Sequence, residues 1–177
     1  MKDNGKLTLV LVNETVGSDR MREWYDIKKL NWRIVEAYGV YGPGMGGMGF
    51  LAEAFSRAVD NESLILPNRD KKFRLLAVED VVEAIKRACF LSGTAGESFL
   101  VVGGETNSEE VAETLINEAK MTKVSVLERA IEVDEWEETE VAENWKKLRW
   151  KPEIKFEKGI EETLQYFFTV KDESSRK

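Results

Sequence analysis

The sequence contains no histidine and only one cysteine, Cys89, among its 177 residues. This chain alone therefore cannot supply a Ser–His or Cys–His nucleophile pair, a histidine metal ligand, an internal disulfide or a cysteine zinc site. Acid–base chemistry would fall to carboxylates, tyrosine or lysine. Because Cys89 lies in the apolar pattern of an expected helix, we interpret it as a small core residue.

Long hydrophobic runs are also missing. The longest, Leu7 to Val12, is too short to cross a bilayer, and no charged-then-apolar signal segment opens the chain. We therefore expect a cytoplasmic protein with no membrane partner. Basic residues are outnumbered 26 to 33 by acidic ones, and the net charge of −7 disfavours nucleic acid as a partner. A small phosphorylated ligand needs only a few local cations and stays open.

What is present is enough apolar material for a packed core, 42% of the residues. Short apolar runs alternate with amphipathic segments, which predicts one α/β domain. We expect residues 6–105 to form mostly a parallel sheet with helices, 106–170 mostly a small C-terminal lobe, and 171–177 a loose tail. The expected strands cover about 6–12, 32–35, 64–66, 73–78, 98–102 and 123–127. The expected helices cover about 20–30, 50–59, 81–89, 108–119, 136–148 and 157–170.

Two helix starts have candidate N-caps, Asp80 and Ser108. The helix after Asp80 is expected to bury five apolar residues: Val81, Val82, Ile85, Ala88 and Cys89. The acidic stretch 132–143 has no defined ligand spacing, so we interpret it as a solvated helix face with no metal. Trp136, Trp145 and Trp150 are candidates for a sugar-stacking platform, but we interpret Trp145 and Trp150 as core residues.

Four segments in a fixed order carry a family resemblance. They are NWRIVEAYGVYGPG (31–44), FRLLAVEDVVEAI (73–85), ESFLVVGGE (97–105), and LRWKP (148–152) followed by a Gly-Ile-x-x-Thr helix (159–163). Together they resemble the C-terminal part of extended short-chain dehydrogenase/reductases of the NAD-dependent epimerase/dehydratase group, without the N-terminal dinucleotide-binding half. The resemblance implies a partial Rossmann-like parallel sheet with helices plus a small C-terminal α+β substrate lobe.

In that family, the segment after the Tyr-Gly-Pro-Gly turn and the C-terminal lobe form the nucleotide-sugar pocket. The resemblance therefore assigns substrate binding to four residues of the turn: Tyr41, Gly42, Pro43 and Gly44. Where the family has an arginine that grips the diphosphate, this chain has Phe73, between Lys72 and Arg74. Either cation can replace the family arginine as a phosphate ligand. Alternatively, both are solvated cations at a strand edge.

The chemistry-bearing positions depart from the family pattern. Glu36-Ala37-Tyr38-Gly39 stands where Arg-Pro-x-Asn is usual, so an arginine and a ligand-binding asparagine are missing. Tyr25 and Lys29 have the family's catalytic Tyr-x3-Lys spacing, and Thr15 follows the preceding strand. However, the register of MREWYDIKKLNW matches the end of the family's long helix, after the catalytic pair. A helix-surface or core role for Tyr25 is the alternative.

No G-x-G-x-x-G loop follows the first expected strand. The glycine run 44–49 is interpreted as a flexible turn or as an edge of the sugar-nucleotide pocket. No cofactor is therefore expected for this chain alone, and NAD(P) is implied only by the resemblance.

Two hypotheses remain open. The chain is a truncated or divergent relative that binds a nucleotide-sugar and is active only if a Rossmann half is supplied elsewhere, or it is a non-catalytic binding or oligomerisation module. An exposed sheet edge predicts self-association or a partner subunit in either case.

Overall fold

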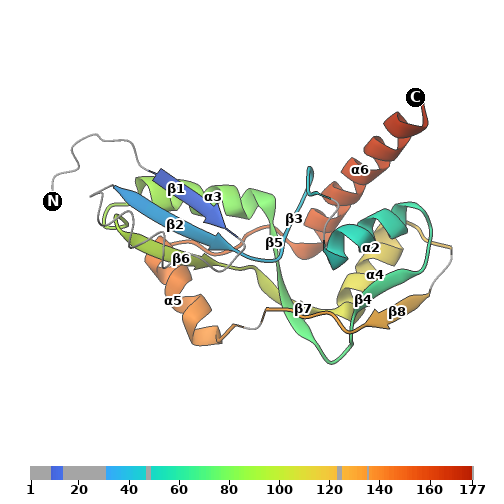
Figure 1. Ribbon diagram of the computed structural model, residues 1–177, viewed down its shortest axis with the longest axis horizontal. Coiled ribbons are helices and arrows are strands. Elements are labelled where there is room, and N and C mark those ends of the chain that lie inside the picture. Colours follow the sequence, from blue (N-terminus) through green and yellow to red (C-terminus); the bar gives the residue numbers. More distant parts are fainter. Residues whose placement is uncertain (1–8, 14–30, 47–48, 123–124, 135, 177) are drawn as a thin grey trace.

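The computed structural model describes residues 9–13, 31–46, 49–122, 125–134 and 136–176 (Figure 1). A parallel sheet in the order β1-β2-β6 combines β1 (Leu9–Asn13), β2 (Trp32–Ala37) and β6 (Glu97–Val101). Helix α3 (Val78–Phe90) and helix α5 (Glu138–Leu148) pack on it. Phe99 and Val101 of β6 contact the core under α3, whereas Leu100 and Val102 contact Val141 of α5. Burial on both faces explains the nearly continuous apolar run of this strand.

The second part of the fold is a lobe, at the right in Figure 1. It contains helices α2 (Phe50–Val59), α4 (Ser108–Glu118) and α6 (Phe156–Ser175). It also contains the parallel pair β4 (Leu64–Pro67) and β8 (Val126–Arg129). Helical spacing on α2 places Leu51, Ala54, Phe55 and Ala58 on one buried face against α4 and α6.

Strand β5 (Lys72–Ala77) joins the sheet to the lobe. It pairs in parallel with β3 (Val40–Tyr41) and antiparallel with β7 (Gly104–Asn107). Because side chains alternate along a strand, Phe73, Leu75 and Ala77 enter the lobe core, while Leu76 enters the core of the main sheet. One strand therefore forms a wall that both cores share.

The expected α/β architecture is confirmed, with local differences at strand β7 and at the helix caps. Strand β7 was not expected, because its sequence GETN has no apolar residue and only its pairing with β5 holds it extended. The Asn107 side chain, not that of Ser108, caps α4 by accepting the backbone N–H groups of Glu109 and Glu110. The Ser108 hydroxyl instead donates to the Pro67 carbonyl at 2.7 Å.

The expected cap role of Asp80 is also wrong. Ala77 occupies the N-cap of α3, and Asp80 lies within the first turn of the helix. Its carboxylate accepts the backbone N–H groups of Glu153 and Ile154 at 3.0 and 3.1 Å. Asp80 therefore fastens the segment that leads into α6, a contact that local sequence cannot reveal.

Two further expectations differ from the structure. Val82 is 52% exposed, because the buried face of α3 runs through Val81, Ala84 and Ala88 and Val82 lies beside that face. Helix α6 continues to Ser175, into the segment expected to be loose, and Lys171 in its last turns pairs with Asp60 at 2.8 Å. Within the ranges that the structure describes, every helix is too short or too polar to cross a membrane.

Candidate functional site

Two adjoining cavities, of about 310 and 110 Å³, lie beside the antiparallel pair of β5 and β7. Four residues border both of them: Phe73, Arg74, Asp134 and Trp136. We call their combined space the Arg74 cleft. Lys72 and Glu105 line its larger part, and Tyr38 and Gly39 line its smaller part.

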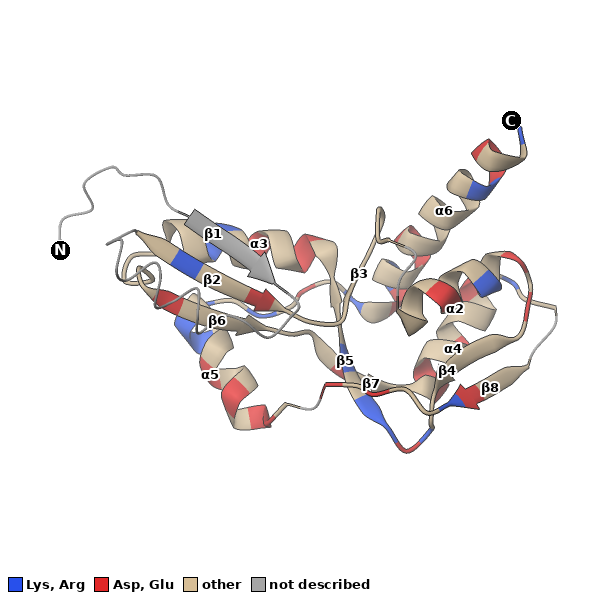
Figure 2. Ribbon diagram, in the orientation of Figure 1, with Lys and Arg blue, Asp and Glu red and all other residues tan. Residues whose placement is uncertain are grey.

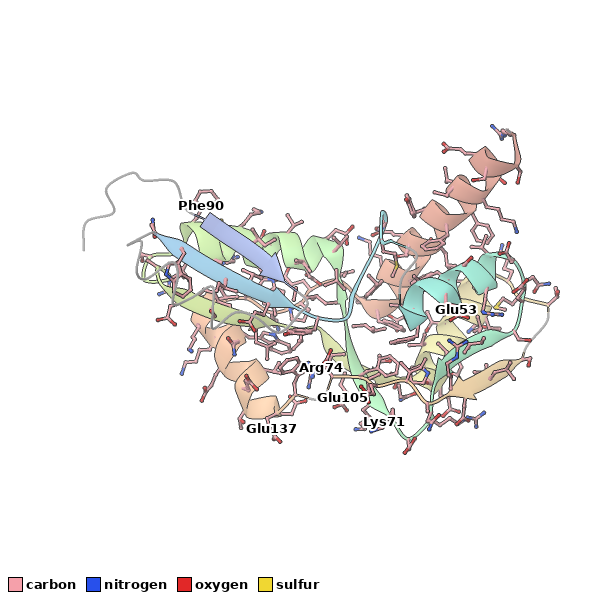
Figure 3. All side chains as sticks on the ribbon, viewed as in Figure 1. Glu53, Lys71, Arg74, Phe90, Glu105 and Glu137 are labelled. Carbon is pink, nitrogen blue, oxygen red and sulfur yellow. The ribbon has the colours of Figure 1, made fainter. Side chains whose placement is uncertain are left out.

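Two cations of the cleft, Arg74 and Lys72, are already paired with carboxylates. The Arg74 side chain is only 7% exposed, donates to the Gly103 carbonyl at 3.0 Å and forms an ion pair with Glu138 at the start of α5. Lys72 donates to Glu105 of β7 at 2.7 Å. Figure 3 shows Arg74 and Glu105 near each other, where β5 pairs with β7. An incoming anion would therefore have to displace these carboxylates.

The Lys72–Glu105 pair shifts both ionisation equilibria in the expected directions. Its hydrogen bond raises the pKa of Lys72 above the ordinary lysine value and lowers the pKa of Glu105 below the ordinary glutamate value. Both groups stay charged at neutral pH.

An aromatic pair forms another wall of the cleft. The rings of Tyr38 and Trp136 lie 4.7 Å apart between centroids, with their planes tilted by 52°. Burial raises the pKa of Tyr38, and the nearby carboxylates of Glu36 and Asp134 raise it further, so its hydroxyl stays protonated. Each ring of the pair has an apolar face and a polar group at its edge, which suits packing against a base or a sugar ring.

The backbone at Gly39 leaves no room for a side chain. Gly39 has a φ of +63°, and a Cβ at this position would lie 2.1 Å from the Arg74 carbonyl oxygen. The Gly39 carbonyl accepts the Leu76 N–H at 2.9 Å, which holds β5 close. No side chain fits at this position, so β5 and its Arg74 approach more closely than an asparagine would permit.

The structure brings together only some of the residues that sequence assigned to substrate binding. Lys72 and Arg74 line the Arg74 cleft, but Tyr41 does not. Tyr41 is 2% exposed, and its ring lies against Gly159 and Phe156 in the lobe core.

The other turn residues do not border the cleft either. Gly42 is buried against Val78, and Pro43 and Gly44 are exposed on the turn. The candidate catalytic residues Thr15, Tyr25 and Lys29 lie outside the residues that the structure describes. Ligand contacts by Tyr41, Gly42, Pro43 and Gly44 stay predictions.

Sequence reasoning named Trp136 only as a candidate sugar-stacking residue and did not place it near Arg74. It missed Tyr38, Asp134 and Glu138 as neighbours of Arg74. Glu132 and Asp134 precede α5, which begins at Glu138, so they lie in a loop and not on the solvated helix face that we expected. The sequence feature that could have indicated this part of the site is a tryptophan that closely follows the acidic residues Glu132 and Asp134. In the described part of the chain, no cluster of acidic residues and cysteine is arranged to hold a metal ion.

The described residues do not fit a dinucleotide loop. Such a loop joins a strand of the main sheet to a helix N-terminus. Here the glycine run follows β3, which pairs with β5 outside the main sheet, and the connection from β1 to β2 lies outside the described residues.

Neither a protein-family model nor a curated protein matches the sequence. Solved structures do match. An epimerase from Methanothermobacter thermautotrophicus has a TM-score of 0.74 and 18% identity, covering 91% of this chain and 50% of its own. UDP-glucuronic acid 4-epimerase from Bacillus cereus, in complex with UDP-glucuronic acid and NAD, has a TM-score of 0.76 and 11% identity. The match covers 92% of this chain and 62% of the epimerase.

A third similar structure is the UDP-glucose 4-epimerase of Thermotoga maritima with UDP-glucose, at a TM-score of 0.71 and 16% identity, covering 94% of this chain and 65% of its own. The chain therefore spans about half to two-thirds of the length of these structures. Its fold is that of the C-terminal part of the sugar-nucleotide epimerases and dehydratases.

Proposed function

We propose that this chain binds a nucleotide-sugar in the Arg74 cleft. The observation that carries the proposal is a nearly buried guanidinium that borders a cavity together with an aromatic pair. Planar guanidinium groups bind phosphate oxygens through two parallel hydrogen bonds, and aromatic faces bind bases and sugar rings. The fold shared with proteins solved with UDP-glucuronic acid and UDP-glucose supports the same ligand class.

Five residues of the cleft contact the ligand in this proposal. Arg74 binds a phosphate oxygen pair, and Lys72 adds a point charge. Tyr38 and Trp136 pack against the base or sugar. Asp134, next to the aromatic pair, accepts hydrogen bonds from sugar hydroxyls. Binding requires Glu138 and Glu105 to swing out toward solvent, and both are exposed enough to do so, with 75% and 43% of their side-chain surface exposed.

NAD(P)-dependent epimerase or dehydratase activity is proposed only for an assembly in which further chain or a partner subunit supplies a dinucleotide-binding half. The solved epimerases are substantially longer than this chain, which supports that condition. The described residues supply no dinucleotide loop of their own, so we assign no catalytic step to them.

Calorimetric titration tests the proposal. We expect UDP-glucuronic acid or UDP-glucose to bind the unmodified protein, and NAD not to bind. Arg74→Ala is expected to weaken nucleotide-sugar binding about tenfold or more, because a hydrogen-bonded charge is lost. Arg69→Ala is the matched control, since Arg69 lies on the preceding loop and pairs with Glu128 outside the cleft. Equal affinities of the two variants, or absence of nucleotide-sugar binding, would contradict the proposal.

A second candidate function is a non-catalytic oligomerisation module. The observation that favours it is two exposed apolar side chains of α3, Phe90 at 86% and Val82 at 52% exposure. Phe90 lies near β1, the edge strand of the sheet (Figure 3). Exposed apolar groups of this size favour a covering partner. Sedimentation at micromolar concentration is expected to show self-association that Phe90→Ser reduces. A monomer at all concentrations would count against this module.

A further inference from the structure

The two parts of the Arg74 cleft differ in charge. Lys71 and Lys72 line only the larger part, Glu132 lines only the smaller part, and Arg74 and Asp134 border both. The larger part has three cations and three carboxylates among its lining residues, whereas the smaller part has one cation and two carboxylates. Figure 2 shows basic residues on β5 and acidic residues in the segment that leads into α5.

The carboxylates of the smaller part have no cation of their own. Within the described ranges, neither Glu132 nor Asp134 forms an ion pair with a lysine or an arginine. The single cation, Arg74, is paired with Glu138, and a diphosphate would take the place of Glu138 in the complex that we propose. With either partner on Arg74, the smaller part keeps an excess of negative charge.

This negative charge extends to the aromatic pair of Tyr38 and Trp136. Burial is the largest cause of the raised pKa of Tyr38, and the carboxylates of Glu36 and Asp134 raise it further. A raised tyrosine pKa means that a second negative charge is disfavoured beside the ring. A ligand group that packs against the aromatic pair therefore meets the field of these carboxylates.

The sizes of the two parts match the two ends of a nucleotide-sugar. The larger part, of about 310 Å³, contains all three cations and suits the diphosphate with its nucleoside. The smaller part, of about 110 Å³, suits the single sugar ring beside Tyr38 and Trp136. In this orientation the sugar lies next to Asp134 and Glu132, which attract an ammonium group and repel a carboxylate.

We propose that the nucleotide-sugar of the Arg74 cleft carries a free amino group on its sugar, and that Asp134 selects it. The inference rests on the proposed function, because it assigns the sugar of that same ligand. The ammonium group donates to the Asp134 carboxylate, and Glu132 adds a second negative charge nearby. A sugar with a carboxylate instead of an amine meets the same two residues and binds more weakly.

Calorimetric titration of the whole chain with UDP-glucosamine, UDP-glucose and UDP-glucuronic acid tests the inference, at a mildly acidic pH that keeps the amine protonated. We expect UDP-glucosamine to bind about threefold more tightly than UDP-glucose, and UDP-glucuronic acid about threefold more weakly, because the selecting carboxylates are exposed. Asp134→Asn should remove most of this order. It should leave UDP-glucose affinity nearly unchanged, because the amide oxygen still accepts hydrogen bonds from sugar hydroxyls.

Glu137→Gln is the matched control, because Glu137 is an exposed carboxylate of the same segment that borders neither part of the cleft. It should leave the order of the three affinities unchanged. Equal affinities of the unmodified protein for the three ligands, or the same loss of preference in Glu137→Gln as in Asp134→Asn, would overturn this inference alone. Absence of binding of all three would overturn the proposed function and this inference with it.

Discussion

The Arg74 cleft and a second cavity beside β5, of about 540 Å³ and lined by Tyr41, differ in how their charges are balanced. We call the second one the Tyr41 cavity. In the cleft, Arg74 and Lys72 each have a carboxylate partner, Glu138 and Glu105. In the cavity, five carboxylates line the wall with no lysine or arginine among the lining residues, and of the five only Glu105 is shown paired with a cation, Lys72. Two neighbouring cavities that share Glu105 therefore differ in charge, because the cations Lys72 and Arg74 line only one of them.

Both cavities depend on close contact of β5 with its neighbours. A substitution that disturbs this contact is expected to have the largest effect on stability. A Cβ at Gly103 would lie 1.8 Å from the Leu75 carbonyl oxygen. Gly103→Ala is therefore expected to lower the free energy of unfolding by about 3 kcal/mol, because neither backbone can yield without breaking the sheet. Urea unfolding measures it. Gly104→Ala, where a Cβ meets nothing within 4 Å, should be nearly neutral.

Asp80 lines the Tyr41 cavity, and its substitution is expected to have the second-largest effect on stability. Asp80→Ala removes the acceptor of the Glu153 and Ile154 N–H groups and is expected to destabilise the fold by about 2 kcal/mol. Glu79→Ala removes a charge from the same helix turn without breaking those bonds. If urea midpoints fell equally in the two variants, Asp80 would act only through its charge at the helix N-terminus.

Glu138 tests the charge balance of the Arg74 cleft, because it is the carboxylate partner of Arg74. Glu138→Gln should raise nucleotide-sugar affinity roughly threefold, because the ligand no longer competes with a full carboxylate charge for Arg74. Glu140→Gln lies in the same first turn and should have little effect. Calorimetry separates the two, and a lower affinity of Glu138→Gln would show that Glu138 supports the ligand.

The smallest expected effect is the pH dependence of the Lys72–Glu105 pair. The hydrogen bond from Lys72 lowers the folded-state pKa of Glu105, so the pair contributes its full stabilisation above the unfolded pKa of about 4.3. That contribution is lost as pH falls through the lowered folded value. An NMR titration of the Glu105 carboxyl should show the depressed pKa. Lys72→Met should return it toward the ordinary value, whereas Lys71→Met should leave it low.

The sequence predicted the elements whose apolar pattern is local. Strands β2, β4, β5 and β6 and helices α2, α4, α5 and α6 lie at the expected positions, with ends that differ by a few residues. Strand β7 could not be predicted, since GETN is extended only because β5 pairs with it. Asp80 was misassigned for the same reason, because its partners lie far along the chain.

The candidate site was predicted only in part. Arg74 and Lys72 were named because they flank the position of the family's phosphate-binding arginine. The contact of Tyr38 with Trp136 could not be found, because the two residues belong to segments far apart in sequence with no shared periodicity. Tyr41 was assigned to the substrate by motif, yet Gly159 leaves room for its ring in the lobe core, beside a different cavity.

An NMR titration of the labelled protein with UDP-glucuronic acid tests whether the Arg74 cleft is the nucleotide-sugar site. The account predicts saturable shifts of the Arg74 side chain, the Gly103 region and the Trp136 indole, with Tyr41 and Gly159 unmoved. Shifts confined to Tyr41 and Gly159, or no saturable shift at Arg74, would contradict the assignment of the Arg74 cleft as the nucleotide-sugar site.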